Sequence, residues 1–174
     1  MKRGLLIGRF QPFHLGHLKG IREILKEVDE LIILIGSAQY SHSFNNPFTA
    51  GERIIMIHDA LVENGFDLSK FYIIPLIDTN DNRIWVAHLT STVPPFDNAY
   101  THNPLVKRLL YESKIDARST DLFNRENYSA TVVRNRILNN GNWEELVPKT
   151  VAKIIKTISG VERIQQIGDS ILKH

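Results

Sequence analysis

Cysteine is absent from the 174-residue chain. Its absence excludes disulfide bonds, thiolate metal sites and cysteine nucleophiles together. A metal site would therefore depend on histidine or carboxylate ligands, or the metal would arrive bound to a substrate.

Long apolar runs are also missing. The longest covers residues 31–35, whereas a membrane-spanning helix needs about 20 apolar residues. The apolar stretch 5–7 is shorter than the ~7–15 residues of a signal-peptide core. We therefore expect a cytoplasmic protein with no membrane partner.

Charge of one sign is not in excess. The chain has 21 Lys and Arg against 19 Asp and Glu, a formal net charge of +2, and its basic residues are dispersed. A protein with so small a net charge has no strong overall electrostatic attraction for nucleic acid, so no nucleic-acid partner is expected. Length and a hydrophobic content of 43% predict one globular domain over residues 1–174, with residues 143–174 as a C-terminal helical cap.

Buried strands alternate with helical patterns along the chain. The strands are continuously apolar, as burial on both faces requires. This order predicts an α/β fold, a Rossmann-like three-layer sandwich with a parallel sheet and helices on both faces. The expected strands are 4–8, 31–36, 71–77, 97–101 and 115–118. The expected helices contain residues 18–28, 49–61, 84–92, 104–111, 129–138, 151–158 and 161–171.

Two local signals refine the helices. Thr49-Ala50-Gly51-Glu52 has the pattern of a capping box, so a helix should begin there, with Ile54, Ile57, His58 and Leu61 on one face. Gly160 is expected to end the helix 151–158.

The most informative stretch is GRFQPFHLGH, residues 8–17. It leaves the first strand at the edge where parallel sheets bind ligands. His14 and His17 are spaced i,i+3 and share one face at the start of a helix. The helix N-terminus, imidazole donors and Arg9 together favour an anion such as phosphate.

Two other interpretations of this stretch were weighed. A zinc pair would prefer i,i+4 spacing and needs further ligands that the stretch does not offer. Ordinary core or surface histidines are the usual explanation of a single histidine. They fit poorly with two histidines that flank a glycine beside an arginine.

A second stretch, Ser129-Ala130-Thr131-Val132-Val133-Arg134, has the features of another anion site. Ser129 is a good N-cap, and Thr131 and Arg134 share a face. Arg136 should point elsewhere. Taken alone, the stretch would suit an ordinary capped helix with solvated arginines better than an anion site.

His14-Leu15-Gly16-His17 resembles the HxGH signature of the nucleotidylyltransferase superfamily. The resemblance implies a reaction that joins a nucleoside triphosphate to an acceptor and releases pyrophosphate. It also implies that the Ser129–Arg134 stretch binds the β- and γ-phosphates.

Over nearly the whole chain the sequence is similar to archaeal-type nicotinamide-nucleotide adenylyltransferases, which make NAD from ATP and nicotinamide mononucleotide (NMN). The stretches that carry this similarity are 8–17, 36–39, 46–53, 94–97, 103–106 and 160–163.

The resemblance implies specific roles. His14, His17, Arg9 and Arg134 would be catalytic. Gly8, Phe10, Gln11, Gly16, Asn103, Ser129 and Thr131 would bind ATP and its phosphates. Asn82, Trp85 and Ser37 would bind NMN: the Trp85 indole could stack on the pyridinium ring and Asn82 could pair with the carboxamide. From the residues alone, Trp85 would equally suit a core position.

The implied mechanism is an in-line attack by the NMN phosphate on the α-phosphorus of ATP. No general base is needed, since a phosphate monoester is largely ionised at pH 7. Mg²⁺ would enter with ATP and no metal-binding residue of the protein is expected. The resemblance further implies a homo-oligomer, a hexamer.

The chain departs from its relatives in two places. They often have Ser-Gly-Asn-Pro where this chain has Thr101-His102-Asn103-Pro104, and some carry an arginine in the loop 39–50, which here has no Lys or Arg. Rival functions are adenylyl transfer to flavin mononucleotide or phosphopantetheine, cytidylyl transfer, and a nucleotide-sensing module without catalysis. His42, the one chargeable side chain of that loop, is a candidate phosphate contact.

Overall fold

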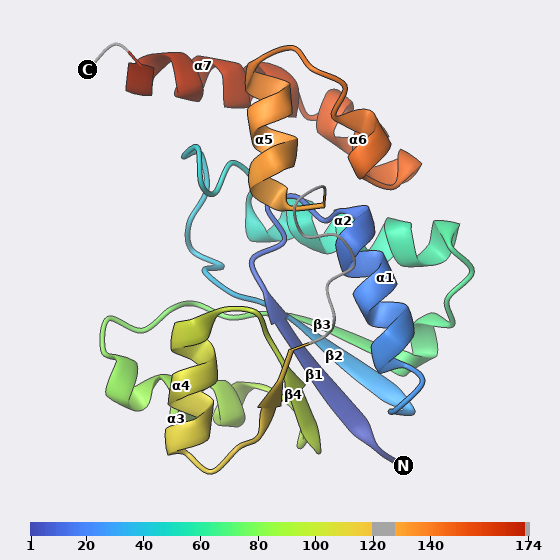
Figure 1. Cartoon of the computed structure of the whole chain (residues 1–174), viewed down its shortest axis with the longest axis vertical. Helices are drawn as coiled ribbons and strands as arrows, with labels where there is room; N and C mark the ends of the chain where they lie inside the picture. Colours follow the sequence, from blue (N-terminus) through green and yellow to red (C-terminus); the bar gives the residue numbers. More distant parts are fainter. Residues whose placement is uncertain (120–127, 173–174) are drawn as a thin grey trace.

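A computed structural model describes residues 1–119 and 128–172 (Figure 1). Its centre is a five-stranded parallel sheet with the strand order β3-β2-β1-β4-β5. The strands are β1 (Arg3–Gly8), β2 (Glu30–Ile35), β3 (Phe71–Pro75), β4 (Asn98–Tyr100) and β5 (Ala117–Arg118). The predicted Rossmann-like α/β fold is confirmed.

Helices connect the strands and cover both faces of the sheet. Figure 1 shows α1 and α2 on one side and α3 and α4 on the other, with α5, α6 and α7 beyond α2. The helices are α1 (Leu15–Ile24), α2 (Ala50–Glu63), α3 (Asn82–Thr92), α4 (Pro104–Glu112), α5 (Ala130–Leu138), α6 (Lys149–Thr157) and α7 (Gly160–Leu172), with short 3-10 helices η1 (Leu68–Lys70) and η2 (Glu144–Leu146).

Burial on both faces of the sheet explains why the sequences of β1 and β2 are continuously apolar. Alternate residues point to opposite faces of a strand. Leu5 and Ile7 pack with α3 and α4, whereas Leu6 packs with α1 and α2. The apolar cluster that contains Leu6 also includes Val133, Val151, Ile155 and Ile164 of the C-terminal helices. The sheet and the helical cap therefore share one core.

Helix α2 begins as predicted. Thr49 Oγ1 accepts from the Glu52 N–H at 3.2 Å and Glu52 Oε2 accepts from the Thr49 N–H at 2.8 Å. Its buried face is displaced from the expected one, because Arg53, Met56 and Ala60 join Ile57 and Leu61 there. His58 was wrongly placed on that face; it is exposed and pairs with Asp59 at 2.8 Å.

Several further boundaries differ from the predictions. Helix α1 ends at Ile24 rather than residue 28, and β5 begins at Ala117 rather than residue 115. Strand β3 ends at Pro75 rather than residue 77. Gly160 does not end a helix but begins α7, and the turn falls on Ile158 and Ser159, which has φ 53°. Gly160 is needed there for space, because a Cβ would lie 2.9 Å from Phe48 Cε1. In the described part of the chain, every helix is too short or too polar to cross a bilayer.

Candidate active site

A cavity of about 710 Å³ lies beyond the carboxyl ends of the strands. The chain runs from β1 to β2 on one side and pairs β1 with β4 on the other, so the strand order reverses at β1. Open α/β sheets bind ligands at such a point. Apart from His42, the residues that the sequence singled out for a site role line this cavity: Gly8, Arg9, Phe10, Gln11, His14, Gly16, His17, Ser37, Asn82, Trp85, Asn103, Ser129, Thr131 and Arg134.

The two histidines form a stacked pair at the start of α1. Their ring centroids are 3.6 Å apart. The His14 backbone N–H donates to His17 Nδ1 at 3.1 Å. Phe13 stacks on His17 at 5.3 Å and Phe10 meets it edge-on at 4.8 Å, so aromatic rings hold the His17 imidazole in place.

Burial keeps both rings neutral. Loss of hydration lowers the pKa of His14 to about 3. Burial, followed by the charges of His14 and His102, lowers the pKa of His17 well below its ordinary value. A neutral imidazole carries one proton, and Nδ1 of His17 is an acceptor, so that proton lies on Nε2. His17 therefore offers an N–H donor from Nε2.

Gly16 explains the middle of the motif. A Cβ there would lie 3.0 Å from the His14 ring and 3.1 Å from Tyr128 Cβ. Both contacts are tighter than an ordinary Cβ contact, so a larger residue would press on the His14 ring that lies over the helix start. His14 Nδ1 is buried without a hydrogen-bond partner, which is a position where a ligand would relieve an unsatisfied polar atom.

Arg134 approaches the same cavity from α5. It is 2% exposed, and its Nη1 donates to the Gln11 carbonyl at 2.9 Å. Its Nη2 donates to Thr131 Oγ1 at 3.3 Å, so the two side chains share a helix face, as predicted. Nε is buried without a partner. Burial, and then the charge of Arg9, lower the pKa of Arg134 to about 10, so it stays a cation at pH 7.

The start of α5 has the predicted cap. Ser129 Oγ accepts from the Val132 N–H at 3.2 Å. Arg136 points away to Glu145 and the Asn142 carbonyl, as expected. The uncharged loop also reaches this end: Asn45 Oδ1 accepts from Arg134 Nη2 at 3.5 Å, and the Phe44 ring lies 5.6 Å from the guanidinium. His42 lies outside the cavity lining, against Ser41 at 2.9 Å.

Arg53 is a cation that the site prediction missed. It is fully buried on α2 and donates to the carbonyls of Arg9 at 2.9 Å and Gly36 at 2.9 Å. It also donates to the carbonyls of Ser37 at 3.1 Å and Thr49 at 3.2 Å. Burial, followed by the charge of Arg9, lowers its pKa to about 10. Arg53 thus joins the loop after β1 to the loop after β2.

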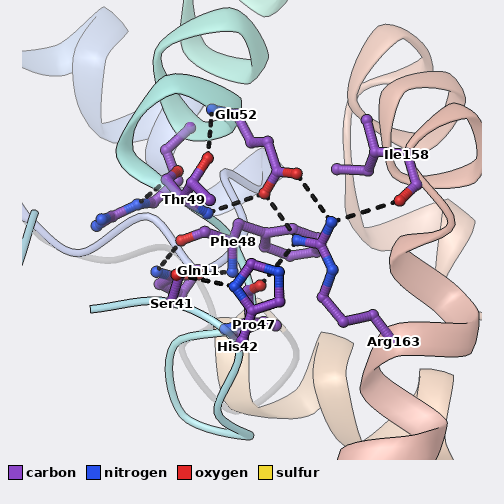
Figure 2. A network of polar contacts seen from close by, with 10 residues as sticks. Gln11, Ser41, His42, Pro47, Phe48, Thr49, Glu52, Ile158 and Arg163 are labelled. Atoms are coloured by element: carbon purple, nitrogen blue, oxygen red, sulfur yellow. Dashed lines mark hydrogen bonds and ion pairs between the residues drawn. The ribbon is translucent and has the colours of Figure 1, made fainter. Parts of the chain in front are cut away.

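The side chain of Gln11 forms hydrogen bonds with the backbone of a single residue, Phe48. Its amide donates to the Phe48 carbonyl and accepts from the Phe48 N–H, both at 2.9 Å (Figure 2). The side chain is 1% exposed. Its polar atoms therefore hold the loop 43–49 against the histidine loop.

The opposite end of the cavity is built from the loops after β2 and β3. Ser37 Oγ donates to Asp78 Oδ2 at 2.6 Å. Asn82 is exposed at the first turn of α3. Trp85 is 7% exposed, packs in the core with Ile7 and Leu34, and still lines the cavity. Trp85 is thus a core residue that also borders the cavity, and its stacking on NMN stays a prediction.

The loop after β4 brings a third histidine to the cavity. His102 lines it between Thr101 and Asn103. The loop is fixed at both sides, because Thr101 N–H donates to the Arg118 carbonyl at 3.0 Å and Asn103 Oδ1 caps α4 through the N–H groups of Leu105 and Val106. The site residues identified by the structure beyond the sequence prediction are Asp78, Thr79, Thr101, Tyr40, Tyr128 and Arg53.

Among the described residues, no group of three or more His, Cys, Asp or Glu side chains is placed so that it could hold a metal ion.

The fold and the site define a nucleotidyltransferase of the class whose family model is described as cytidylyltransferase-like, which matches residues 5–136. The relatives described below are named nicotinamide-nucleotide adenylyltransferase. The chain belongs to that family.

The relatives match along nearly their full length. The protein of Methanocorpusculum labreanum is 52% identical over 98% of this chain and 99% of its own. That of Archaeoglobus fulgidus is 51% identical over 95% and 97%, and that of Picrophilus torridus 48% over 97% and 98%.

Solved structures agree with the fold. A bifunctional NMN adenylyltransferase/ADP ribose pyrophosphatase from Francisella tularensis, complexed with AMP and a manganese ion, has a TM-score of 0.79 and 26% identity over 99% of this chain. A second structure of that bifunctional protein has a TM-score of 0.82 and 24% identity. The chain spans 54% of each of these solved chains.

Proposed function

We propose that the protein transfers the adenylyl group of ATP to nicotinamide mononucleotide, giving NAD⁺ and pyrophosphate. The observation that carries this proposal is the meeting of two distant stretches at one cavity. His14 and His17 lie in the N-terminal loop, Arg134 lies on α5, and the Gln11 carbonyl joins them through a 2.9 Å hydrogen bond. Full-length similarity to enzymes of that name supports the choice of substrates.

The triphosphate fits between the histidine pair and the start of α5. His17 Nε2–H, the unpartnered Arg134 Nε–H and the exposed Arg9 are donors on residues that line this space. The α5 N-terminus adds the partial positive charge of its first backbone N–H groups. Ser129 and Thr131 place two hydroxyls there. Gly8, Phe10, Gln11, Gly16 and Asn103 shape this half of the cavity more than they offer free donors.

NMN belongs at the other end, between the loops after β2 and β3. An indole face is a suitable surface for a cationic ring and contributes ~0.5–2 kcal/mol. The exposed amide of Asn82 can both donate and accept, which matches a carboxamide. Ser37 and its partner Asp78 supply polar atoms at the same wall.

The proposed reaction is a direct in-line displacement. An oxygen of the NMN phosphate forms a bond to the α-phosphorus, and the bond from that phosphorus to the bridging oxygen of the β-phosphate breaks. Pyrophosphate leaves with the electron pair, so no proton transfer and no covalent enzyme intermediate are required. Catalysis then consists of positioning and charge stabilisation by His14, His17, Arg9 and Arg134.

The divalent ion is treated as part of the substrate. Mg²⁺ binds phosphate oxygens and water more readily than all-protein cages, and the described residues offer no built cage. We therefore propose Mg–ATP as the species that enters. The same proposal includes a cytoplasmic location and a homo-oligomer, a hexamer, whose mass in solution would be measured by light scattering.

The decisive experiment incubates the protein with Mg–ATP and one acceptor at a time: NMN, flavin mononucleotide, phosphopantetheine, or nicotinate mononucleotide. Pyrophosphate release and dinucleotide formation are measured. We expect turnover with NMN and none with the flavin or pantetheine phosphate. Binding of ATP and NAD without turnover would instead indicate a sensor, and turnover with another acceptor alone would assign a different transferase.

A further inference from the structure

Two of the sequence stretches that carry the family resemblance meet in space outside the cavity. Arg163 of α7 lies against residues 47–52 (Figure 2). Its Nη1 donates to the Pro47 carbonyl at 3.0 Å and to Glu52 Oε2 at 2.8 Å. Its Nη2 donates to Glu52 Oε1 at 2.9 Å. The Arg163 guanidinium therefore binds the Glu52 carboxylate and the Pro47 backbone carbonyl at the same time.

This ion pair is largely shielded from water. The side chains of Arg163 and Glu52 are 18% and 19% exposed. Burial alone would raise the pKa of Glu52, but hydrogen bonds from Arg163 and Thr49 outweigh it and hold the pKa below its ordinary value. A two-pronged arginine–carboxylate contact fixes orientation as well as distance. The position of the Pro47 carbonyl is thus tied to α7.

Phe48 connects the segment held by Arg163 to the loop that carries His14 and His17. Its side chain is fully buried, and α7 packs so closely that a Cβ on Gly160 would lie 2.9 Å from its ring. Its backbone N–H and carbonyl are both bound by the Gln11 amide at 2.9 Å. Gln11 in turn presents its own carbonyl to Arg134 Nη1 at 2.9 Å.

We propose that Arg163 is a positioning residue for the triphosphate: through Pro47 and Phe48 it fixes Gln11, and the Gln11 carbonyl fixes Arg134. This rests on the proposed function, because it assigns Arg134 to the phosphates of ATP. Arg163 itself does not line the cavity. Its contribution is the placement of a buried cation to within the few tenths of an ångström that catalytic geometry needs.

The first test substitutes Arg163 with alanine and with lysine, and measures kcat and the KM for each substrate well below the unfolding temperature. For Arg163→Ala we expect the KM for ATP to rise about tenfold and the KM for NMN to change less than about twofold, since only one end of the cavity loses its support. Lysine can pair with Glu52 but lacks the fork, so Arg163→Lys should recover part of the loss.

The matched control is Lys156→Ala. Lys156 of α6 pairs with Glu144 at 2.7 Å, so this variant removes another ion pair of the C-terminal helices. It should leave both KM values unchanged. A purely structural role of Arg163 would lower the active fraction and hence kcat while leaving both KM values alone, and this result would overturn the proposal.

A double-mutant cycle tests the route. Gln11→Met keeps the side-chain length and removes both hydrogen bonds to Phe48. If Arg163 acts through Gln11, the variant with both substitutions should raise the KM for ATP no more than the larger single substitution. If the effects of the two single substitutions on the KM for ATP multiply in the double variant, Arg163 and Gln11 act independently, and this result would overturn the route. If Arg163→Ala fails to fold, Arg163→Lys carries the same cycle. Failure of the wild type to transfer adenylyl groups would instead contradict the proposed function.

Discussion

The backbone N–H of His14 donates to Nδ1 of His17 at 3.1 Å, and this single hydrogen bond sets the chemistry of the second histidine. Because Nδ1 is an acceptor, the proton of the neutral ring lies on Nε2. The histidine that begins the motif thus determines which nitrogen of the other can donate to a phosphate. The i,i+3 spacing is required for this contact, since it brings the side chain of the third helical position back to the N-cap backbone.

His17→Ala should lower kcat by about 100-fold or more, the usual size of an electrostatic contribution to a transition state, and change the KM for ATP much less. The donor matters most when charge builds on the α-phosphate. His17→Gln places an amide N–H near the position of Nε2 and should retain more activity than alanine. Steady-state kinetics with saturating NMN provide the measurement, and a variant with parental kcat would remove His17 from the transition state.

The stability of the free protein should depend on pH through His14. Burial lowers its pKa from 6.5 to about 3, so below about pH 6.5 the unfolded chain takes up a proton there that the folded chain does not. Stability is therefore constant at higher pH and falls as the pH falls. At pH 5.5 the loss is about 1.4 kcal/mol, one pH unit below the ordinary value. The lowered pKa of His17 acts in the same direction.

Urea unfolding at pH 7.5 and 5.5 measures this dependence. The His14→Gln variant cannot take up the proton and should lose less stability than the parent between the two values. His58→Gln, which changes an exposed histidine of α2, should retain the parental dependence. Parallel losses in the parent and in His14→Gln would mean that His14 is not the group responsible.

Much of this site was predictable because its signals are local. Apolar runs place the strands, and the HxGH and Ser129–Arg134 stretches each lie at a helix start. Arg53 could not be found in this way. Its four acceptor carbonyls come from two separate loops, the one after β1 and the one after β2, and in sequence it is one more charged residue on an amphipathic helix. Gly160 is similar, since only the packing of Phe48 against α7 shows why a helix begins with glycine.

Trp85 requires a variant that separates its two surfaces. Because the indole packs from α3 into the core, Trp85→Ala should destabilise the fold by about 3–5 kcal/mol as well as weaken NMN binding. Trp85→Phe keeps most of the core volume and presents a smaller ring face to the cavity. We expect it to raise the KM for NMN severalfold and leave that for ATP unchanged. Equal changes in both KM values would assign Trp85 to the core alone.

His102 lines the cavity that holds the histidine pair. Its charge also disfavours protonation of His17, so the two rings are close enough to interact. We expect His102→Gly to raise the KM for ATP about five- to tenfold, since a hydrogen bond to a charged group contributes ~1.5 kcal/mol or more. His102→Gln keeps a donor and should have a KM for ATP nearer to that of the parent. The control, His58→Gln, should have the parental KM for ATP. A lower KM for ATP in His102→Gly would mean that the imidazole obstructs the nucleotide instead of binding it.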